Sequence, residues 1–124
     1  MNITIPTSEW SSPYTSSIER QIWIPSRGEL YEDYTTTHEG PCFEYFINKT
    51  DNSYRIACTS DGTARPWWTR SCVEGSNPYA RSIMVSGAIT NNPQGIALYC
   101  RPVFCLSNSL PVALISDGVY DLVV

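Results

Sequence analysis

The sequence predicts an α+β domain in which a short antiparallel sheet is accompanied by two short helices and long loops. Short β-prone runs recur along the chain, separated by clusters of Gly, Pro, Asn and Ser that are typical of turns. Helix-start signals are confined to the first half, where Ser26 and Glu29 have the spacing of a capping box. A chain of 124 residues suits one hydrophobic core. We therefore expect an arm or linker over residues 1–17 and one domain over residues 18–124.

Both helices are expected near the start of the domain. Residues 3–5 of the arm are expected to add a short edge strand, and residues 21–24 form a β-prone run that a proline stops. The capping box predicts a short helix that begins after Ser26. Residues 43–47 fit either a helical turn or a strand, and their apolar residues favour the helical spacing.

The middle of the chain is expected to consist of strands joined by polar loops. β-prone composition predicts strands over residues 54–58, 67–70 and 80–86. Residues 73–79 contain Glu-Gly-Ser-Asn-Pro and are expected to form a loop. Residues 90–95, Thr-Asn-Asn-Pro-Gln-Gly, are a strong turn signal. We expect these two polar segments to be displayed at the surface.

The last third of the chain is the most apolar. Residues 96–106 form a long apolar run that contains Pro102, so a bend, a bulge or a sheet edge is expected there. Residues 110–115 and 119–124 flank an Asp-Gly pair and predict a terminal hairpin.

Two Arg-Pro dipeptides flank the polar segments. The first lies in Ala-Arg-Pro-Trp-Trp-Thr-Arg-Ser-Cys (64–72) and the second in Cys-Arg-Pro-Val-Phe-Cys-Leu (100–106). On a strand, Trp67 and Trp68 point to opposite faces, so one of them is expected to anchor the core.

Two arginines are expected at strand ends. Arg70 and Arg101 are able to bind loop carbonyls or carboxylates such as Glu29 or Glu44. Direct contact with a ligand is the alternative role for both guanidinium groups.

Composition excludes several classes of protein. The net charge is −4 and only 16% of residues are charged, so there is no basic stripe for nucleic acid. No apolar run is long enough to span a bilayer, and the N-terminus lacks the pattern of a secretion signal. The chain is rich in Ser, Thr, Asn and Tyr, a composition that resembles recognition loops.

The cysteines do not form a recognisable framework. The chain has five cysteines, which is an odd number, and their spacing is irregular: Cys42, Cys58, Cys72, Cys100 and Cys105. Buried thiols that act as small apolar groups are the leading interpretation. A single disulfide and a metal site are the alternatives, although the chain has only one histidine, His38. A reducing compartment, such as a bacterial cytoplasm, is expected for assembly.

Four motifs follow one another in a distinctive order. They are Ile-Trp-Ile-Pro-Ser-Arg-Gly-Glu-Leu-Tyr (22–31), Glu-Gly-Pro-Cys-Phe-Glu-Tyr-Phe (39–46), Trp-Trp-Thr-Arg-Ser (67–71) and Arg-Pro-Val-Phe-Cys-Leu (101–106). This order resembles an uncharacterised C-type lectin-like domain family of phage structural proteins and gut-bacterial surface proteins. That fold is shared with formylglycine-generating enzymes and with diversified phage tip proteins. The resemblance covers about residues 20–106, and it departs from the family pattern at Thr69 and before the second Arg-Pro.

The resemblance implies a domain at the surface of a phage virion, in a tail or head fibre or tip, that attaches the particle to its host cell through exposed loops. Amides and a tyrosine in the polar segments are able to hydrogen-bond and stack on a ligand. The candidate ligand-binding residues are Asn77, Tyr79, Asn91, Asn92 and Gln94. The alternative is a capsid or tail decoration or assembly component without receptor binding, which docks through residues 1–17 and 110–124.

An enzyme is not expected. The chain has no GxSxG, HExxH, phosphate-loop or dinucleotide motif, and its lone histidine gives no base for a cysteine nucleophile. No cofactor and no metal are expected, because Glu74 is the only acid between Arg70 and Arg101 and a calcium site needs several. The expected partners are other virion proteins, further copies of the chain, and a host surface glycan or protein, in a virion assembled in the bacterial cytoplasm.

Overall fold

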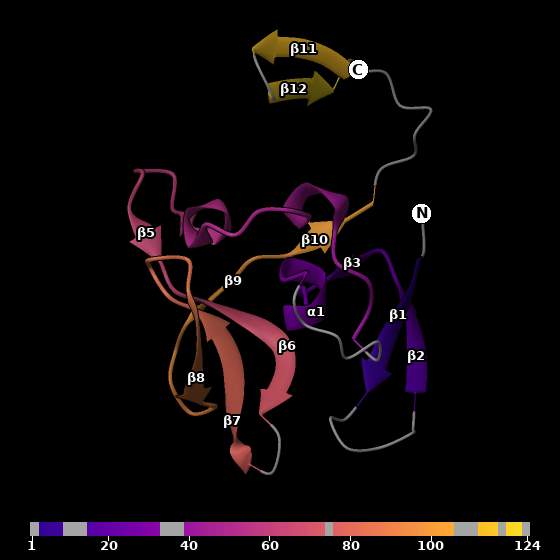
Figure 1. Ribbon diagram of the computed structural model, residues 1–124, viewed down its shortest axis with the longest axis vertical. Helices are drawn as coiled ribbons and strands as arrows, with labels where there is room; N and C mark the ends of the chain where they lie inside the picture. Colours follow the sequence, from indigo (N-terminus) through magenta and orange to yellow (C-terminus); the bar gives the residue numbers. More distant parts are fainter. Residues whose placement is uncertain are drawn as a thin grey trace.

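The computed structural model describes residues 3–8, 15–32, 39–73, 76–105, 112–116 and 119–122, and strands form most of them (Figure 1). The helical elements are single turns: α1 (Arg27–Leu30), η1 (Glu44–Phe46) and η2 (Asn52–Arg55). The first strands are β1 (Ile3–Ser8), β2 (Thr15–Arg20), β3 (Ile22–Trp23), β4 (Ala57–Cys58) and β5 (Ala64–Arg65). The later strands are β6 (Trp67–Val73), β7 (Ser76–Ile83), β8 (Ile89–Pro93), β9 (Tyr99–Cys100), β10 (Val103–Phe104), β11 (Val112–Ser116) and β12 (Val119–Leu122).

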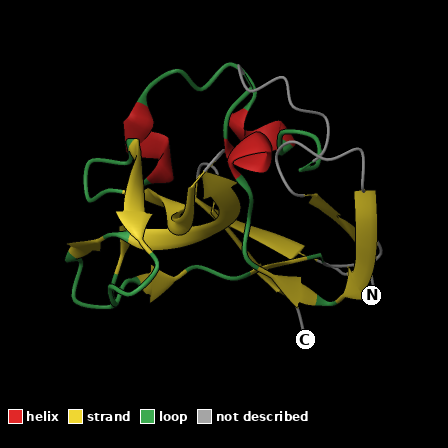
Figure 2. Cartoon of the chain, turned by 90° about the horizontal axis from the view of Figure 1, so that it is seen from below, coloured by secondary structure: helices red, strands yellow, loops and turns green. Residues whose placement is uncertain are grey.

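A four-stranded sheet in the order β8–β7–β6–β9 organises the molecule. The pairs β8–β7 and β7–β6 are antiparallel, whereas β6 and β9 are parallel. The other strands form four two-stranded ribbons: β1–β2, β3–β10, β4–β5 and β11–β12. Figure 2 shows the helical turns gathered on one side of the strands.

The hydrophobic core lies between that sheet and the helical turns. Trp67 and Ile83 are register partners on β6 and β7, so both side chains point to the same face, where both are fully buried. Leu30 from α1 and Phe46 from η1 cover them. The expectation that one of the two adjacent tryptophans anchors the core is confirmed for Trp67, while Trp68 is half-buried on the other face.

The expected α+β, C-type lectin-like architecture is wrong, because the described residues are mainly β. The helix that begins after Ser26 lasts one turn, and its last residue is followed by extended backbone at Tyr31. Residues 43–47, for which a helical turn was favoured over a strand, form only the single 3-10 turn η1. Residues 54–58, expected as a strand, are split between the end of η2 and the two-residue β4.

The two polar segments also contribute strand residues where a loop and a turn were expected. Residues 76–79 belong to β7 and residues 90–93 belong to β8, whereas Gln94 and Gly95 form a turn as expected. Their Asn, Pro and Ser residues signal turns locally, but pairing between the strands overrides that signal. Pro93 is tolerated at the end of an edge strand, and Pro78 lies close to the register shift between β6 and β7.

A network of buried polar groups ties α1 to β6. The capping box predicted from the sequence is confirmed, because Ser26 Oγ accepts from the Glu29 N–H and Glu29 Oε2 accepts from the Ser26 N–H. Arg70 donates to both carboxylate oxygens of Glu29, at 2.6 and 2.9 Å, and to the carbonyl of Glu39. Ser71 Oγ donates to Glu39 Oε2 at 2.8 Å. The expected pairing of Arg70 with Glu29 is therefore confirmed.

The pairing of β6 with β7 is irregular beside Arg70. Between Trp68 and Cys72 the register with β7 shifts, so extra residues of β6 oppose the partner strand. There the Arg70 N–H donates to the carbonyl of Pro25 instead of to β7. Burial alternates regularly over residues 67–71, and the half-buried Arg70 meets Glu29 of α1.

The buried Arg55 holds the loops around η1 and η2 together. Its side chain is 2% exposed and donates to the carbonyls of Leu30, Lys49 and Asp51. The guanidinium lies over the Tyr31 ring, 3.8 Å from the ring centroid. Carbonyl dipoles and the ring face together stabilise a charge that would otherwise be costly to bury.

Candidate functional site

A groove with aromatic and arginine side chains lies at the β9 edge of the four-stranded sheet. Its walls come from the β4–β5 ribbon on one side and from β9 and the following Arg101 and Pro102 on the other. Its volume is about 260 Å³. We call it the arginine–aromatic groove, and its lining residues are Ile56, Ala57, Cys58, Thr59, Arg65, Trp67, Tyr99, Cys100, Arg101 and Pro102.

Strand pairing places the two rings of the groove side by side. Trp67 and Tyr99 are register partners in the parallel pair β6–β9, so their side chains share one face of the sheet. Trp67 is buried, and its indole N–H donates to the carbonyl of Arg55 at 3.2 Å. Tyr99 lies at the sheet edge and is 49% exposed. The groove therefore offers one accessible ring beside a fixed one.

Each ring carries a guanidinium group. The Arg65 Cζ lies 5.7 Å from the centroid of the Tyr99 ring, and the Arg101 Cζ lies 5.5 Å from a ring centroid of Trp67. Both distances are within the about 6 Å over which a cation is attracted to a ring face. Both arginine side chains are exposed. The ion pair among the described side chains is Arg70–Glu29, so the described residues show no carboxylate partner for Arg101, and its expected binding to a loop carbonyl or carboxylate stays a prediction.

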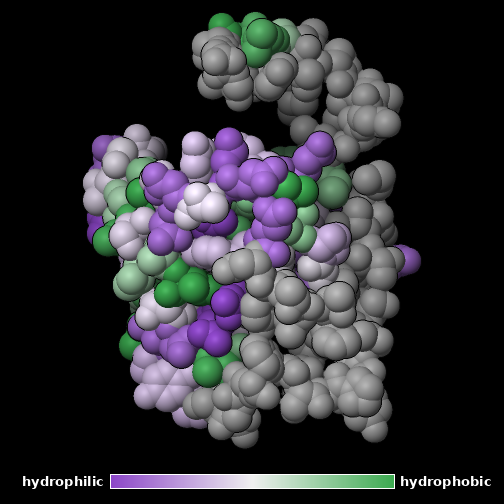
Figure 3. All heavy atoms as spheres, in the orientation of Figure 1, coloured by the Kyte–Doolittle hydropathy of each residue, from purple (hydrophilic) through white to green (hydrophobic). Residues whose placement is uncertain are grey.

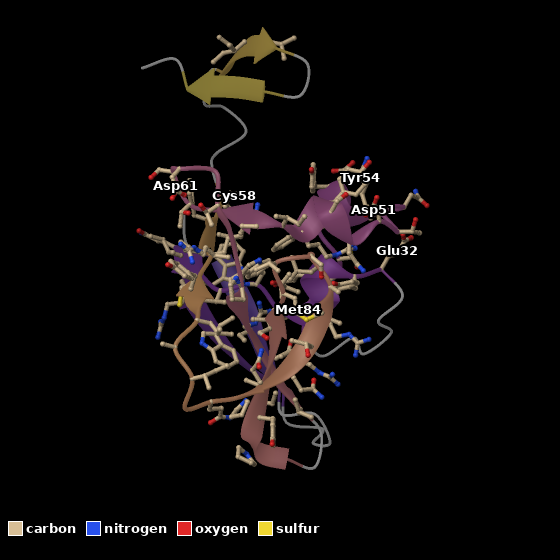
Figure 4. The ribbon with its side chains drawn as sticks, turned by 90° about the vertical axis from the view of Figure 1, so that its left-hand side faces the viewer. Glu32, Asp51, Tyr54, Cys58, Asp61 and Met84 are labelled. Carbon is tan, nitrogen blue, oxygen red and sulfur yellow. The ribbon has the colours of Figure 1, made fainter. Side chains whose placement is uncertain are left out.

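The turn that joins β4 to β5 is held by its own polar groups. Asp61 accepts from the Thr59 hydroxyl and from the Thr63 N–H, and these bonds hold the pKa of its carboxyl below the usual 3.8. Figure 4 shows Cys58 and Asp61 close to each other at this turn. The carboxylate is thus engaged within the turn and does not line the groove.

The residues predicted to bind a ligand lie elsewhere, on the β7–β8 hairpin. Tyr79 is 40% exposed and stands opposite Pro93. Asn91 accepts from Arg81, whereas Asn92 donates to Ser82 Oγ at 2.6 Å. Neighbouring strand residues point to opposite faces, so the hairpin does not bring these two amides together.

The remaining two predicted residues mark the ends of the hairpin strands. The Gln94 N–H donates to the carbonyl of Pro78 at 2.8 Å, and this bond links the residue after β8 to β7 at the end of the hairpin opposite its turn. Asn77 belongs to β7, and its side chain lies outside the described residues.

The cysteines are unpaired, but the expectation that they are buried is wrong for three of them. Cys58, Cys72 and Cys100 are exposed, while Cys42 and Cys105 are half-buried. Cys58 and Cys100 both line the arginine–aromatic groove. No cluster of three or more His, Cys, Asp or Glu side chains able to hold a metal occurs in the described part of the chain.

Sequence reasoning missed Arg65 and Tyr99. The signal that points to them is the repeated Arg-Pro dipeptide, because each wall of the groove contains one of the two. The repeated dipeptide indicates a shared site only when the pairing of β6 with β9 is known. A parallel pairing between strands so distant in the chain is not visible in local patterns.

Comparison with known proteins yields one finding. A family model described as "Domain of unknown function (DUF6273)" matches residues 1–108. No curated protein and no solved structure matches the chain. The described residues contain no helix that is long and apolar enough to cross a membrane.

Proposed function

This chain belongs to the DUF6273 family, and on that premise we propose that its domain is a non-catalytic recognition module, which attaches a phage virion to a saccharide on the host surface through the arginine–aromatic groove. The observation that carries the proposal is the exposed Tyr99 ring at the mouth of the groove, beside the fixed Trp67. The virion context rests on the resemblance of the four motifs, in their order, to phage structural proteins.

The groove has the features of a small binding site. A half-exposed tyrosine ring presents an apolar face to the ring of a ligand, and its hydroxyl is able to hydrogen-bond. The volume of about 260 Å³ is just under the range of roughly 300–1,000 Å³ for drug-sized ligands. A single sugar-sized unit therefore suits it better than an extended peptide.

Substitution of Tyr99 by alanine is expected to weaken saccharide binding about tenfold, because a central aromatic residue typically contributes more than about 1 kcal/mol to an interface. The unaltered chain is first tested on an array of bacterial surface glycans, and the dissociation constant of the strongest hit is then measured by calorimetry. Stability is expected to change little, because the ring is half-exposed at a sheet edge.

Two control variants locate the effect. Tyr54→Ala removes a tyrosine that is 41% exposed at another place on the surface (Figure 4), and it is expected to bind as the unaltered chain does. The double variant Tyr79→Ala, Asn91→Ala tests the hairpin. A loss of binding in this double variant, with none in Tyr99→Ala, would move the site to the hairpin. Binding to no glycan at all would reject saccharide recognition.

A second candidate function, assembly without receptor binding, is favoured by the β11–β12 hairpin. The predicted terminal hairpin is confirmed, and it lies beyond residue 108, where the family match ends. Leu114 and Ile115 are adjacent residues of β11, and they are 62% and 64% exposed. The hairpin stands apart from the other sheets (Figure 1) and carries apolar surface (Figure 3). A lone two-stranded hairpin is marginally stable, so a partner surface would stabilise it.

The assembly candidate predicts a concentration-dependent oligomer whose mass falls to that of a monomer when Leu114 and Ile115 are both replaced by serine. Light scattering after size-exclusion chromatography measures the mass. Ile96→Ser serves as the control, since it removes an exposed apolar side chain outside the hairpin. A monomer at high concentration for the unaltered chain would exclude self-assembly through this hairpin.

A further inference from the structure

We infer that the arginine–aromatic groove selects acidic saccharides, with the carboxylate or sulfate group of a sugar held by Arg65 and Arg101. The inference rests on the proposed function, because it names the class of saccharide that the same groove would take. Two observations support it: the hydrogen-bond donors of the two guanidinium groups are unused in the described part of the chain, and the described lining of the groove contains no acidic residue.

The hydrogen-bond donors of Arg65 and Arg101 are not used by any described residue. In the part of the chain that the structure describes, neither side chain makes a hydrogen bond or an ion pair; each makes only its ring contact. Four other arginines donate hydrogen bonds to a carbonyl, a carboxylate or an amide oxygen: Arg20, Arg55, Arg70 and Arg81. Two exposed guanidinium groups with free donors therefore line the same groove.

The charges that line the groove are positive. Its lining, in the part of the chain that the structure describes, includes no Asp or Glu. The ionised Asp61 lies in the turn between β4 and β5, where it accepts two hydrogen bonds, and it is not part of this lining. The chain as a whole has a net charge of −4, so attraction of an anion has to come from this local pair of charges.

The contact of each guanidinium group with a ring leaves its N–H donors available for an anion. These donors lie in the plane of the group and match the two oxygens of a carboxylate or a sulfate. The sugar ring that bears this anion would lie against the exposed Tyr99. Neutral sugars lack the group that these donors fit, so we expect weaker binding of a neutral sugar.

Three matched ligands test the charge: methyl glucoside, methyl glucuronide and methyl glucoside 6-sulfate. They share one ring and differ only at the sixth carbon, which carries a hydroxyl, a carboxylate or a sulfate. The acidic sugars are expected to bind at least about tenfold more tightly than the neutral one, as charge-assisted hydrogen bonds imply. Comparison of the two acidic sugars shows which anion is preferred.

The exposed cysteines supply a site-specific readout in the unaltered chain. Cys58 and Cys100 line the groove, whereas Cys72 is exposed outside it. The acidic sugars are expected to slow alkylation of Cys58 and Cys100 and to leave the rate at Cys72 unchanged. Calorimetric titration gives the dissociation constants on the same samples.

Neutral variants assign the effect to the two arginines. Arg65→Gln and Arg101→Gln are each expected to reduce the preference for acidic over neutral sugar severalfold, and the double variant is expected to remove it. Arg20→Gln is the control, because Arg20 is exposed but is not part of the groove. Thermal unfolding of each variant, expected to be unchanged, verifies that it folds.

The outcomes separate this inference from the proposed function. Equal affinity for all three sugars, lost in Tyr99→Ala, would overturn the acidic preference and leave saccharide recognition intact. Binding of inorganic sulfate as tight as that of the sugar sulfate, unaffected by Tyr99→Ala, would overturn the saccharide and leave a simple anion site. Protection of Cys72 to the same extent as Cys58 and Cys100 would overturn the location.

Discussion

Replacement of Arg70 by methionine is expected to destabilise the protein by about 3–5 kcal/mol, the usual cost of removing one partner of a buried ion pair. The Glu29 carboxylate, whose side chain is 6% exposed, would lose both charge-assisted bonds and remain buried. The carbonyls of Ile24 and Glu39 would lose a donor as well. The buried polar network between α1 and β6 would thus be left with an uncompensated charge.

Urea denaturation measures this cost as a fall in the unfolding midpoint at an unchanged slope. Arg65→Met is the matched control, because it makes the same change at an exposed arginine without hydrogen bonds in the described part of the chain. It is expected to shift the free energy of unfolding by less than about 0.5 kcal/mol. Equal effects of the two substitutions would show that the Arg70–Glu29 pair does not stabilise the fold.

Gly87→Ala is expected to cost about 3 kcal/mol or more, because a backbone strain and a steric overlap add. Gly87 adopts a φ of +81° in the turn between β7 and β8. A Cβ added there would lie 1.8 Å from the carbonyl oxygen of Asn52. The Tyr31 hydroxyl also donates to the Gly87 carbonyl at 3.0 Å, so the turn cannot shift without breaking this bond.

Gly62→Ala separates the two contributions. Gly62 has the same φ of +81°, but nothing lies within 4 Å of an added Cβ. This variant is therefore expected to cost only the left-handed strain, about 1–2 kcal/mol. Thermal unfolding of both variants measures the difference. Equal losses would show that the turn moves away from Asn52 at little cost.

Local signals in the sequence predicted local structure well. The capping box at Ser26 depends on residues three positions apart, and it formed as expected. The terminal hairpin around residues 117–118 was likewise encoded by neighbouring turn residues. The pairing of Arg70 with Glu29 was predictable because a buried guanidinium needs a carboxylate or carbonyls, and few acids were within reach.

Features that depend on pairing between distant segments could not be predicted. The Asn-Asn-Pro segment at 91–93 is a turn by its residue types, yet it forms β8 because β7 offers it a complete ladder and the partners Arg81 and Ser82. The arginine–aromatic groove depends on the pairing of β6 with β9, and no local pattern encodes that pairing. The α+β expectation failed for the same reason, since strand pairing replaced the anticipated loops.

The parallel pairing of β6 with β9 also determines which part of the groove forms last. The antiparallel strands β6, β7 and β8 follow one another along the chain, so short connections are enough to assemble them. Tyr99 and Arg101 follow β8 in the sequence. The wall of the groove that they form is therefore expected only after β7 and β8 have brought the chain back to β6. During synthesis, a nascent chain would therefore contain three of the four strands of the sheet before it contained the wall of the groove that carries Tyr99 and Arg101.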